Sequence, residues 1–177
     1  MLEVIILAAG QGSRMQSSLP KVLHTLAGQP LVAHVLQTAR ALRAERIHVV
    51  VGHGAEAVEA TVSAPDVQCH LQAEQLGTGH AVQQALGACD RVSTVLVLFG
   101  DVPLITNQAL QDVVSAVDDG IAMLSATLNN PTGYGRVVRD DPGAFVGVVE
   151  EKDATPEPRS VQEVNTGVLA ANAEQPS

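Results

Sequence analysis

The sequence of 177 residues predicts an α/β protein, with a mostly parallel mixed sheet, helices on both faces and antiparallel β segments added late in the chain. Short β-branched runs alternate with segments whose apolar residues recur at the helical period. Residues 95–99 are apolar throughout, as in a central strand covered on both faces. Strand, helix and strand repeated in this order give parallel strands joined by right-handed crossovers.

The elements follow one another along the first two thirds of the chain. Residues 4–7 are the first expected strand, and a loop rich in Gly, Ser and Pro continues to residue 30. Residues 31–42 place their apolar side chains on one face of a helix. The next expected elements are strand 47–51, helix 57–62, strand 67–71, helix 81–86, strand 95–99, a helix over 110–117 that Thr106 caps, and strand 121–128.

The pattern changes after residue 129, where Gly and Pro interrupt shorter segments. Residues 135–139, 145–149 and 164–171 are expected to be antiparallel strands. Residues 153–160, with two prolines and mixed charge, are expected to be a surface loop.

Composition excludes several classes of protein. Apolar residues make up 46% and charged residues 16%, which is too apolar for a disordered chain. No apolar run approaches the roughly 18 residues that span a bilayer, so we expect no membrane insertion. The opening residues carry Glu3 where a signal peptide has a basic flank, which favours a buried strand in a cytoplasmic protein. Cys69 and Cys89 lack metal-type spacing and are expected to be buried free thiols.

Charge and aromatic content bear on the partner. With a net charge of −9, one Tyr, two Phe and no Trp, we expect no nucleic-acid partner. Residues 1–46 nevertheless carry five Arg or Lys against two acidic residues. Positive charge for a small phosphate compound would therefore come from early in the chain.

The loop LAAGQGSRM ends the first expected strand, and ligands of open α/β sheets gather at such strand ends. Gly10 and Gly12 allow a tight turn that brings backbone N–H groups close to an anion, while Arg14 and Lys21 supply charge. A dinucleotide fingerprint needs a third glycine where Met15 stands, and a P-loop is absent. A purely structural turn is the other interpretation.

The segment QAEQLGTGHA, residues 72–81, lies where a strand passes into a helix. Gly77 and Gly79 expose amides near a helix N-terminus, and Gln72 and Gln75 match the donor and acceptor edge of a base. The alternative is a loop with Thr78 as its N-cap.

FGDVPL places Asp101 directly after the most apolar strand. A carboxylate there suits Mg²⁺, which is usually held by one or two carboxylates plus substrate phosphates. The alternative is an aspartate that caps a turn before Pro103. The six histidines show no metal-binding spacing, so His24 and His80 are expected to be surface or core residues.

LAAGxGxRM followed by PKVLH resembles the signature of the sugar-nucleotide pyrophosphorylases, and closely that of the bacterial bifunctional N-acetylglucosamine-1-phosphate uridyltransferases. QAEQLGTGHA is nearly identical to the uracil-reading segment of that family. FGDVPL, PTGYGR, VEEKD and EVNTG follow in order, so the resemblance covers about residues 2–171. It implies the Rossmann-like fold of nucleotide-diphospho-sugar transferases.

The resemblance implies UTP and N-acetylglucosamine-1-phosphate as substrates and Mg²⁺ as cofactor. It assigns catalysis to Arg14, Lys21 and Asp101, with Asp101 also the metal ligand. The implied nucleotide-binding residues are Leu7, Ala8, Ala9, Gly10, Gly12, Lys21, Gln72, Gly77 and Thr78. The implied sugar-binding residues are Gly100, Gly135, Glu150, Asn165 and Thr166.

The implied reaction yields UDP-N-acetylglucosamine, a cell-wall precursor, and pyrophosphate, with catalysis by positioning and charge neutralisation. Two alternatives stay open: a nucleotidyltransferase for another sugar phosphate, and a nucleotide-binding module without turnover. In the family this domain continues with an asparagine that is a second metal ligand, and a trimer-forming β-helix acetyltransferase domain follows. We therefore expect residues 1–177 to be a nucleotidyltransferase domain truncated at its C-terminal end, without acetyl transfer or trimerisation.

Overall fold

The computed structural model describes residues 1–10, 17–91, 93–118 and 120–173. The chain forms two compact units. Unit 1 comprises Met1–Ala122 with Leu169–Ser177, and unit 2 comprises Met123–Val168.

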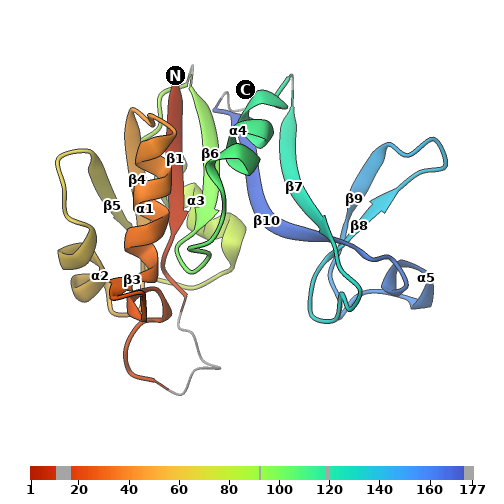
Figure 1. Ribbon diagram of the computed structural model, residues 1–177, viewed down its shortest axis with the longest axis horizontal. Coiled ribbons are helices and arrows are strands. Elements are labelled where there is room, and N and C mark those ends of the chain that lie inside the picture. Colours follow the sequence, from red (N-terminus) through yellow and green to blue (C-terminus); the bar gives the residue numbers. More distant parts are fainter. Residues whose placement is uncertain (11–16, 92, 119, 174–177) are drawn as a thin grey trace. The chain divides into compact units, whose positions relative to one another are not determined.

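The sheet of unit 1 confirms the expected parallel core (Figure 1). Its strands lie in the order β5 (Val67–Leu71), β4 (Arg46–Val51), β1 (Leu2–Leu7) and β6 (Thr94–Phe99), and all three pairings are parallel. The last part of β10 (Glu163–Asn172) pairs antiparallel with β6, since Leu169 lies opposite Val97. The carboxyl ends of β1, β5 and β6 therefore point toward the same edge of the sheet.

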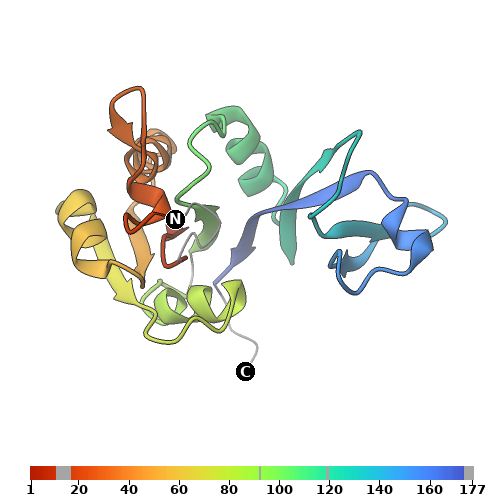
Figure 2. The same ribbon diagram turned by 90° about the horizontal axis from the view of Figure 1, so that it is seen from below.

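Helices cover both faces of this sheet, with α1 (Leu31–Ala41) on one side and α3 (Thr78–Leu86) on the other (Figure 2). The remaining helices of unit 1 are α2 (Ala55–Val62) and α4 (Asn107–Ser115). Thr106 caps α4 as expected, because its Oγ accepts a hydrogen bond from the Ala109 N–H at 3.3 Å. Within the described residues no helix is both long enough and apolar enough to cross a membrane.

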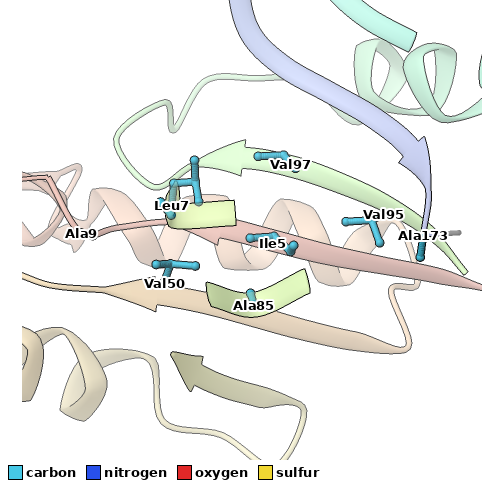
Figure 3. Packing of buried hydrophobic residues seen from close by; sticks show 9 residues of the cluster. Ile5, Leu7, Ala9, Val50, Ala85, Val95, Val97 and Ala173 are labelled. Carbon is cyan, nitrogen blue, oxygen red and sulfur yellow. The ribbon is translucent and has the colours of Figure 1, made fainter. Parts of the chain in front are cut away.

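The core beneath α3 is built from alternate strand residues and small helix residues (Figure 3). Ile5 and Leu7 of β1 share this face with Val50 of β4, because strand side chains alternate between the two faces. Ala81 and Ala85 of α3 are buried against them. Their short side chains bring α3 close to the sheet and hold its N-terminus near the carboxyl ends of the strands.

A second buried feature of the same unit is polar. Nε2 of His48 lies 2.9 Å from Oε2 of Glu3, and Nδ1 of His48 lies 2.9 Å from Nε2 of His70. Glu3 and His48 are both almost fully buried. Burial by itself raises the pKa of Glu3, but hydrogen bonds from the Asp90 N–H and from His48 bring it below its usual value. Burial raises the pKa of the nearby Cys89 thiol to about 12. Both cysteines are free, as expected, but they are half-buried and not buried.

Residues 20–30 differ from the expected loop. They contain a short 3₁₀ helix η2 (Lys21–Leu23) and a small hairpin of β2 (Thr25–Leu26) and β3 (Gln29–Pro30). The two residues of the turn, Ala27 and Gly28, both have positive φ, as a type I′ hairpin turn requires. The sequence does not indicate this turn, because alanine occupies a position where glycine or asparagine is usual.

Unit 2 holds the antiparallel strands expected after residue 129. β8 (Arg136–Arg139) pairs antiparallel with β9 (Phe145–Val149) and, at Arg136 opposite Val164, with β10. β7 (Ile121–Thr127), which begins in unit 1, pairs with β10. The segment 153–160, expected to be a loop, contains the one-turn helix α5 (Pro156–Arg159), since proline is tolerated in a first helical turn.

Candidate active site

The carboxyl ends of β1, β5 and β6 border a pocket of about 530 Å³ in unit 1. Four sequence segments meet here: the start of the glycine loop, η2, the segment that runs from the end of β5 into α3, and the segment after β6. The lining residues are Leu7, Ala8, Ala9, Gly10, Lys21, Val22, Gln72, Gln75, Gly77, Thr78, Ala81, Phe99 and Asp101. The structure thus gathers most of the implied nucleotide-binding residues around one cavity.

The backbone of the glycine loop is held at its start by residues from two other segments. The Ala8 N–H donates to the Val50 carbonyl at 2.8 Å, and the Gln75 side-chain amide donates to the Ala9 carbonyl at 2.8 Å. Gly52 packs directly against Ala9, where a Cβ would lie 2.9 Å from the Ala9 Cβ. Residues 11–16 lie outside the described part of the chain, and so do the implied roles of Gly12 and Arg14.

Lys21 and Asp101 form an ion pair in the pocket, with 2.6 Å between Nζ and Oδ2. Lys21 is the first residue of η2, and Asp101 follows β6 by two residues. The two side chains are 44% and 25% exposed, so both are open to a bound ligand. A carboxylate beside a lysine at a strand end fits a divalent cation whose remaining ligands are phosphate oxygens.

Gln72 follows β5 and is 4% exposed. Its Nε2 lies 3.2 Å from the Gly77 carbonyl and 3.1 Å from Nδ1 of His80. Gly77, not Thr78, is the N-cap of α3, with φ of 101° and ψ of 179°. Only glycine adopts these angles readily, and a cap without a side chain leaves the first amides of the helix unoccupied.

Gly100 lies behind the pocket and is not among its lining residues. Its N–H donates to the Leu7 carbonyl at 2.9 Å, and a Cβ on it would lie 3.2 Å from the Leu7 carbonyl oxygen and 3.2 Å from Val22. The glycine therefore allows β6 to pass close to the start of the loop. Its implied contact with sugar stays a prediction.

Three of the other implied sugar-binding residues lie together in unit 2. The Asn165 N–H donates to the Gly135 carbonyl at 2.9 Å, and a Cβ on Gly135 would lie 3.2 Å from Oε1 of Glu150. Thr166 is engaged elsewhere, because its hydroxyl donates to the Leu124 carbonyl at 2.6 Å. The same Cβ on Gly135 would lie 2.8 Å from Cγ1 of Val148, so glycine at position 135 leaves room for both Val148 and the Glu150 carboxylate.

The buried Arg136 holds the segment that carries Glu150. Its side chain is 2% exposed, and its guanidinium donates to the Tyr134 carbonyl and pairs with Glu151 at 2.6 Å. This hydrogen-bonded pair keeps the pKa of Glu151 below its usual value. The ion pair fixes the residue next to Glu150, and nothing in the sequence pattern singled out Arg136 for this role.

Gln75 and Gly52 support the start of the glycine loop through contacts that the sequence did not indicate. Gln75 was expected to offer its amide to a base, but that amide donates to the Ala9 carbonyl. Gly52 was not singled out at all, although it directly follows an apolar strand, which is a position where a close backbone approach is common. His80 is partly buried, which is compatible with the expected surface or core role, and its Nδ1 lies 3.1 Å from the side-chain amide of Gln72.

Residues 4–148 match the family model described as a MobA-like NTP transferase domain. The chain belongs to this family, and its class is therefore that of the nucleotidyltransferases.

Among curated proteins, the chain is 55% identical over 175 residues to the bifunctional protein GlmU of Burkholderia orbicola and 54% identical over 174 residues to that of Cellvibrio japonicus. These alignments cover 98% of this chain but only 39% and 38% of the relatives. Among solved structures, a nucleotidyl transferase from Methanothermobacter has a TM-score of 0.68 at 20% identity, covering 98% of this chain and 72% of that one. HddC from Yersinia pseudotuberculosis has a TM-score of 0.75 at 18% identity, covering 98% and 78%. The two structures support the fold.

Proposed function

We propose that this chain transfers a uridylyl group from UTP to N-acetylglucosamine-1-phosphate, giving UDP-N-acetylglucosamine and pyrophosphate. The observation that carries the proposal is the convergence of Lys21, Asp101 and the Gln72 amide on one pocket that the glycine loop also borders. A cation and a carboxylate suit a metal-bound polyphosphate, and a buried amide suits a base. The 55% identity to a bifunctional GlmU supports the choice of substrates.

In the proposed reaction a phosphate oxygen of the sugar phosphate forms a bond to the α-phosphorus of UTP. The bond from that phosphorus to the oxygen bridging the α- and β-phosphates breaks, and pyrophosphate leaves with the bonding electrons. The chain supplies no covalent intermediate in this scheme. Lys21 neutralises phosphate charge, and backbone amides near Gly10 orient the triphosphate.

Asp101 is the residue that would hold Mg²⁺ in this proposal, and Lys21, its partner in the ion pair, would then contact the phosphates. The bound ion would supply positive charge that stabilises the negative charge developing on the phosphates. Gly135, Glu150 and Asn165 would bind the sugar, whose hydroxyl and amide groups suit the carboxylate and amide that lie together in unit 2.

The proposal is tested by measuring UTP binding by calorimetry, with and without Mg²⁺, on the wild type, Asp101→Ala and a control, Asp141→Ala, in an exposed turn of unit 2. We expect UTP binding that Mg²⁺ strengthens in the wild type and the control but not in Asp101→Ala. A module that binds nucleotide without metal chemistry would be indifferent to both changes.

Turnover is measured separately, as pyrophosphate release from each of the four common NTPs with N-acetylglucosamine-1-phosphate. Release with UTP alone supports the proposal. Release with another NTP at an equal or higher rate would contradict it and point to a different nucleotidyltransferase.

A further inference from the structure

The orientation of the Gln72 side-chain amide is constrained by the Gly77 carbonyl oxygen, which can only accept a hydrogen bond. The Gly77 carbonyl lies 3.2 Å from the amide, so the end that faces it must be the nitrogen, Nε2. The same nitrogen lies 3.1 Å from Nδ1 of His80, which accepts its second hydrogen when the imidazole carries its own hydrogen on Nε2. In that tautomer both hydrogens of the amide are used inside the protein.

The oxygen of the same amide is left for a ligand. Within the described residues no hydrogen bond reaches Oε1 of Gln72, while Gln72 itself lines the pocket. An oxygen in this position accepts and cannot donate. This oxygen therefore favours a base that presents an N–H group to it.

With N3 of the base placed opposite Oε1, uracil and cytosine differ. N3 of uracil carries a hydrogen, whereas N3 of cytosine carries a lone pair, which would face the lone pairs of Oε1. A site that hydrogen-bonds one partner discriminates against the other because its own polar group is left unpaired.

His80 decides whether the amide can turn round. It lies in the first turn of α3, and its Nδ1 can accept from Gln72 when the imidazole carries its hydrogen on Nε2. Nε2 of Gln84 lies 3.1 Å from Nε2 of His80 and also donates to the His80 carbonyl at 3.1 Å. Gln84 is partly exposed, so it can exchange the bond to that carbonyl for water and turn its oxygen toward Nε2 of His80. Gln72 is buried and cannot adapt in this way, so its contact sets the imidazole.

We infer that His80 is a positioning residue that fixes the Gln72 amide with its oxygen toward the base and thereby selects UTP over CTP. The inference rests on the proposed function and adds to it a residue outside the implied ligand set. Without the imidazole the amide keeps only its 3.2 Å bond to Gly77 and can rotate to offer Nε2 to the ring nitrogen of cytosine.

The test compares UTP and CTP binding by calorimetry, with Mg²⁺, on the full chain. His80→Leu removes the acceptor, His80→Asn keeps an acceptor oxygen near the position of Nδ1, and Gln84→Ala removes only the outer neighbour. We expect the ratio of UTP to CTP affinity to fall at least about tenfold in His80→Leu, to stay within about threefold of wild type in His80→Asn, and to be unchanged in Gln84→Ala. A loss of stability alone would weaken both nucleotides and leave the ratio unchanged.

An unchanged ratio in His80→Leu, or equal losses in His80→Leu and His80→Asn, would overturn the inference while the UTP preference of the wild type still stands. A wild type with no preference for UTP would instead count against the proposed function. Should His80→Leu not fold, N3-methyl-UTP tests the same geometry on the unaltered chain. We expect it to bind at least about tenfold more weakly than UTP, and equal binding would rule out the orientation of Gln72.

Discussion

Nζ of Lys21 lies 2.6 Å from Oδ2 of Asp101, although the two residues are 80 positions apart in the sequence and belong to different segments. Partly exposed ion pairs of this kind contribute little to stability, at most about 1 kcal/mol. The pair is better understood as two ligand-binding groups that lie side by side before substrate binds: a cation for phosphate and a carboxylate for metal. Substrate binding could therefore separate the Lys21 and Asp101 side chains at a small cost in free energy.

Lys21→Ala tests this interpretation. We expect the free energy of unfolding to change by less than about 0.5 kcal/mol, because the side chain is 44% exposed. The Kd for UTP should rise at least about tenfold, equivalent to about 1.4 kcal/mol, because a phosphate loses its counter-charge. Urea unfolding and calorimetry measure the two quantities. Lys152→Ala, the only other lysine, is the control and should leave both unchanged.

Gly52→Ala should disturb the glycine loop from behind. The added Cβ would lie 2.9 Å from both the Cβ and the carbonyl oxygen of Ala9, so the backbone of Ala9 must move. We expect a loss of about 1–3 kcal/mol in stability and weaker UTP binding.

Gly87→Ala is the matched control for that change, because a Cβ there meets nothing within 4 Å and φ is −66°. We expect it to raise stability by about 0.5 kcal/mol by restricting the unfolded chain. Equal effects of the two alanines on UTP binding would show that contact with Ala9 is unimportant.

Glu3→Ala should be one of the most damaging single changes in unit 1. It leaves the buried His48 imidazole and the Asp90 N–H without their carboxylate partner. Removing one member of a buried ionic hydrogen bond costs about 3 kcal/mol or more. Urea unfolding measures the loss, and the exposed Glu45→Ala should cost less than about 0.5 kcal/mol. A small effect of Glu3→Ala would mean that water replaces the carboxylate.

Glu163 makes the stability of unit 2 depend on pH. Its hydrogen bonds with Arg139 and Ser125 lower the pKa of the carboxyl from 4.5 to about 2. A folded-state pKa below the unfolded value stabilises the protein above pH 4.5, and that contribution is lost as the pH falls from 4.5 toward 2. Because Arg139 is 44% exposed, solvent screening reduces the contribution to about 1 kcal/mol.

The measurement is urea unfolding of the wild type and Glu163→Gln across this range. The wild type should be more stable by about 1 kcal/mol near neutral pH, and the difference should shrink to about zero near pH 2. A difference that does not change with pH would mean that the side chain acts by packing and not by charge.

Local pattern was sufficient for the parallel core and for most of the elements around it. β1, β4 and β6 were recognised from apolar runs, and α1 and α4 from apolar residues at the helical period. Each of these elements lies close to its expected bounds. The hairpin of β2 and β3 was not predicted because Ala27 has a positive φ, which is unusual for alanine. The one-turn helix α5 was not predicted because its prolines are equally typical of a loop.

The sequence by itself determined which chemical groups this protein has at its strand ends: a glycine loop, a lysine, an aspartate and a glutamine-rich segment. Those groups follow from short runs of neighbouring residues, which a single chain displays directly. Only the tertiary structure decided what each group touches, because contacts depend on atoms brought together from distant segments. It turned the Gln75 amide to the Ala9 carbonyl, placed Gly52 against Ala9, and set the His80 ring beside the Gln72 amide.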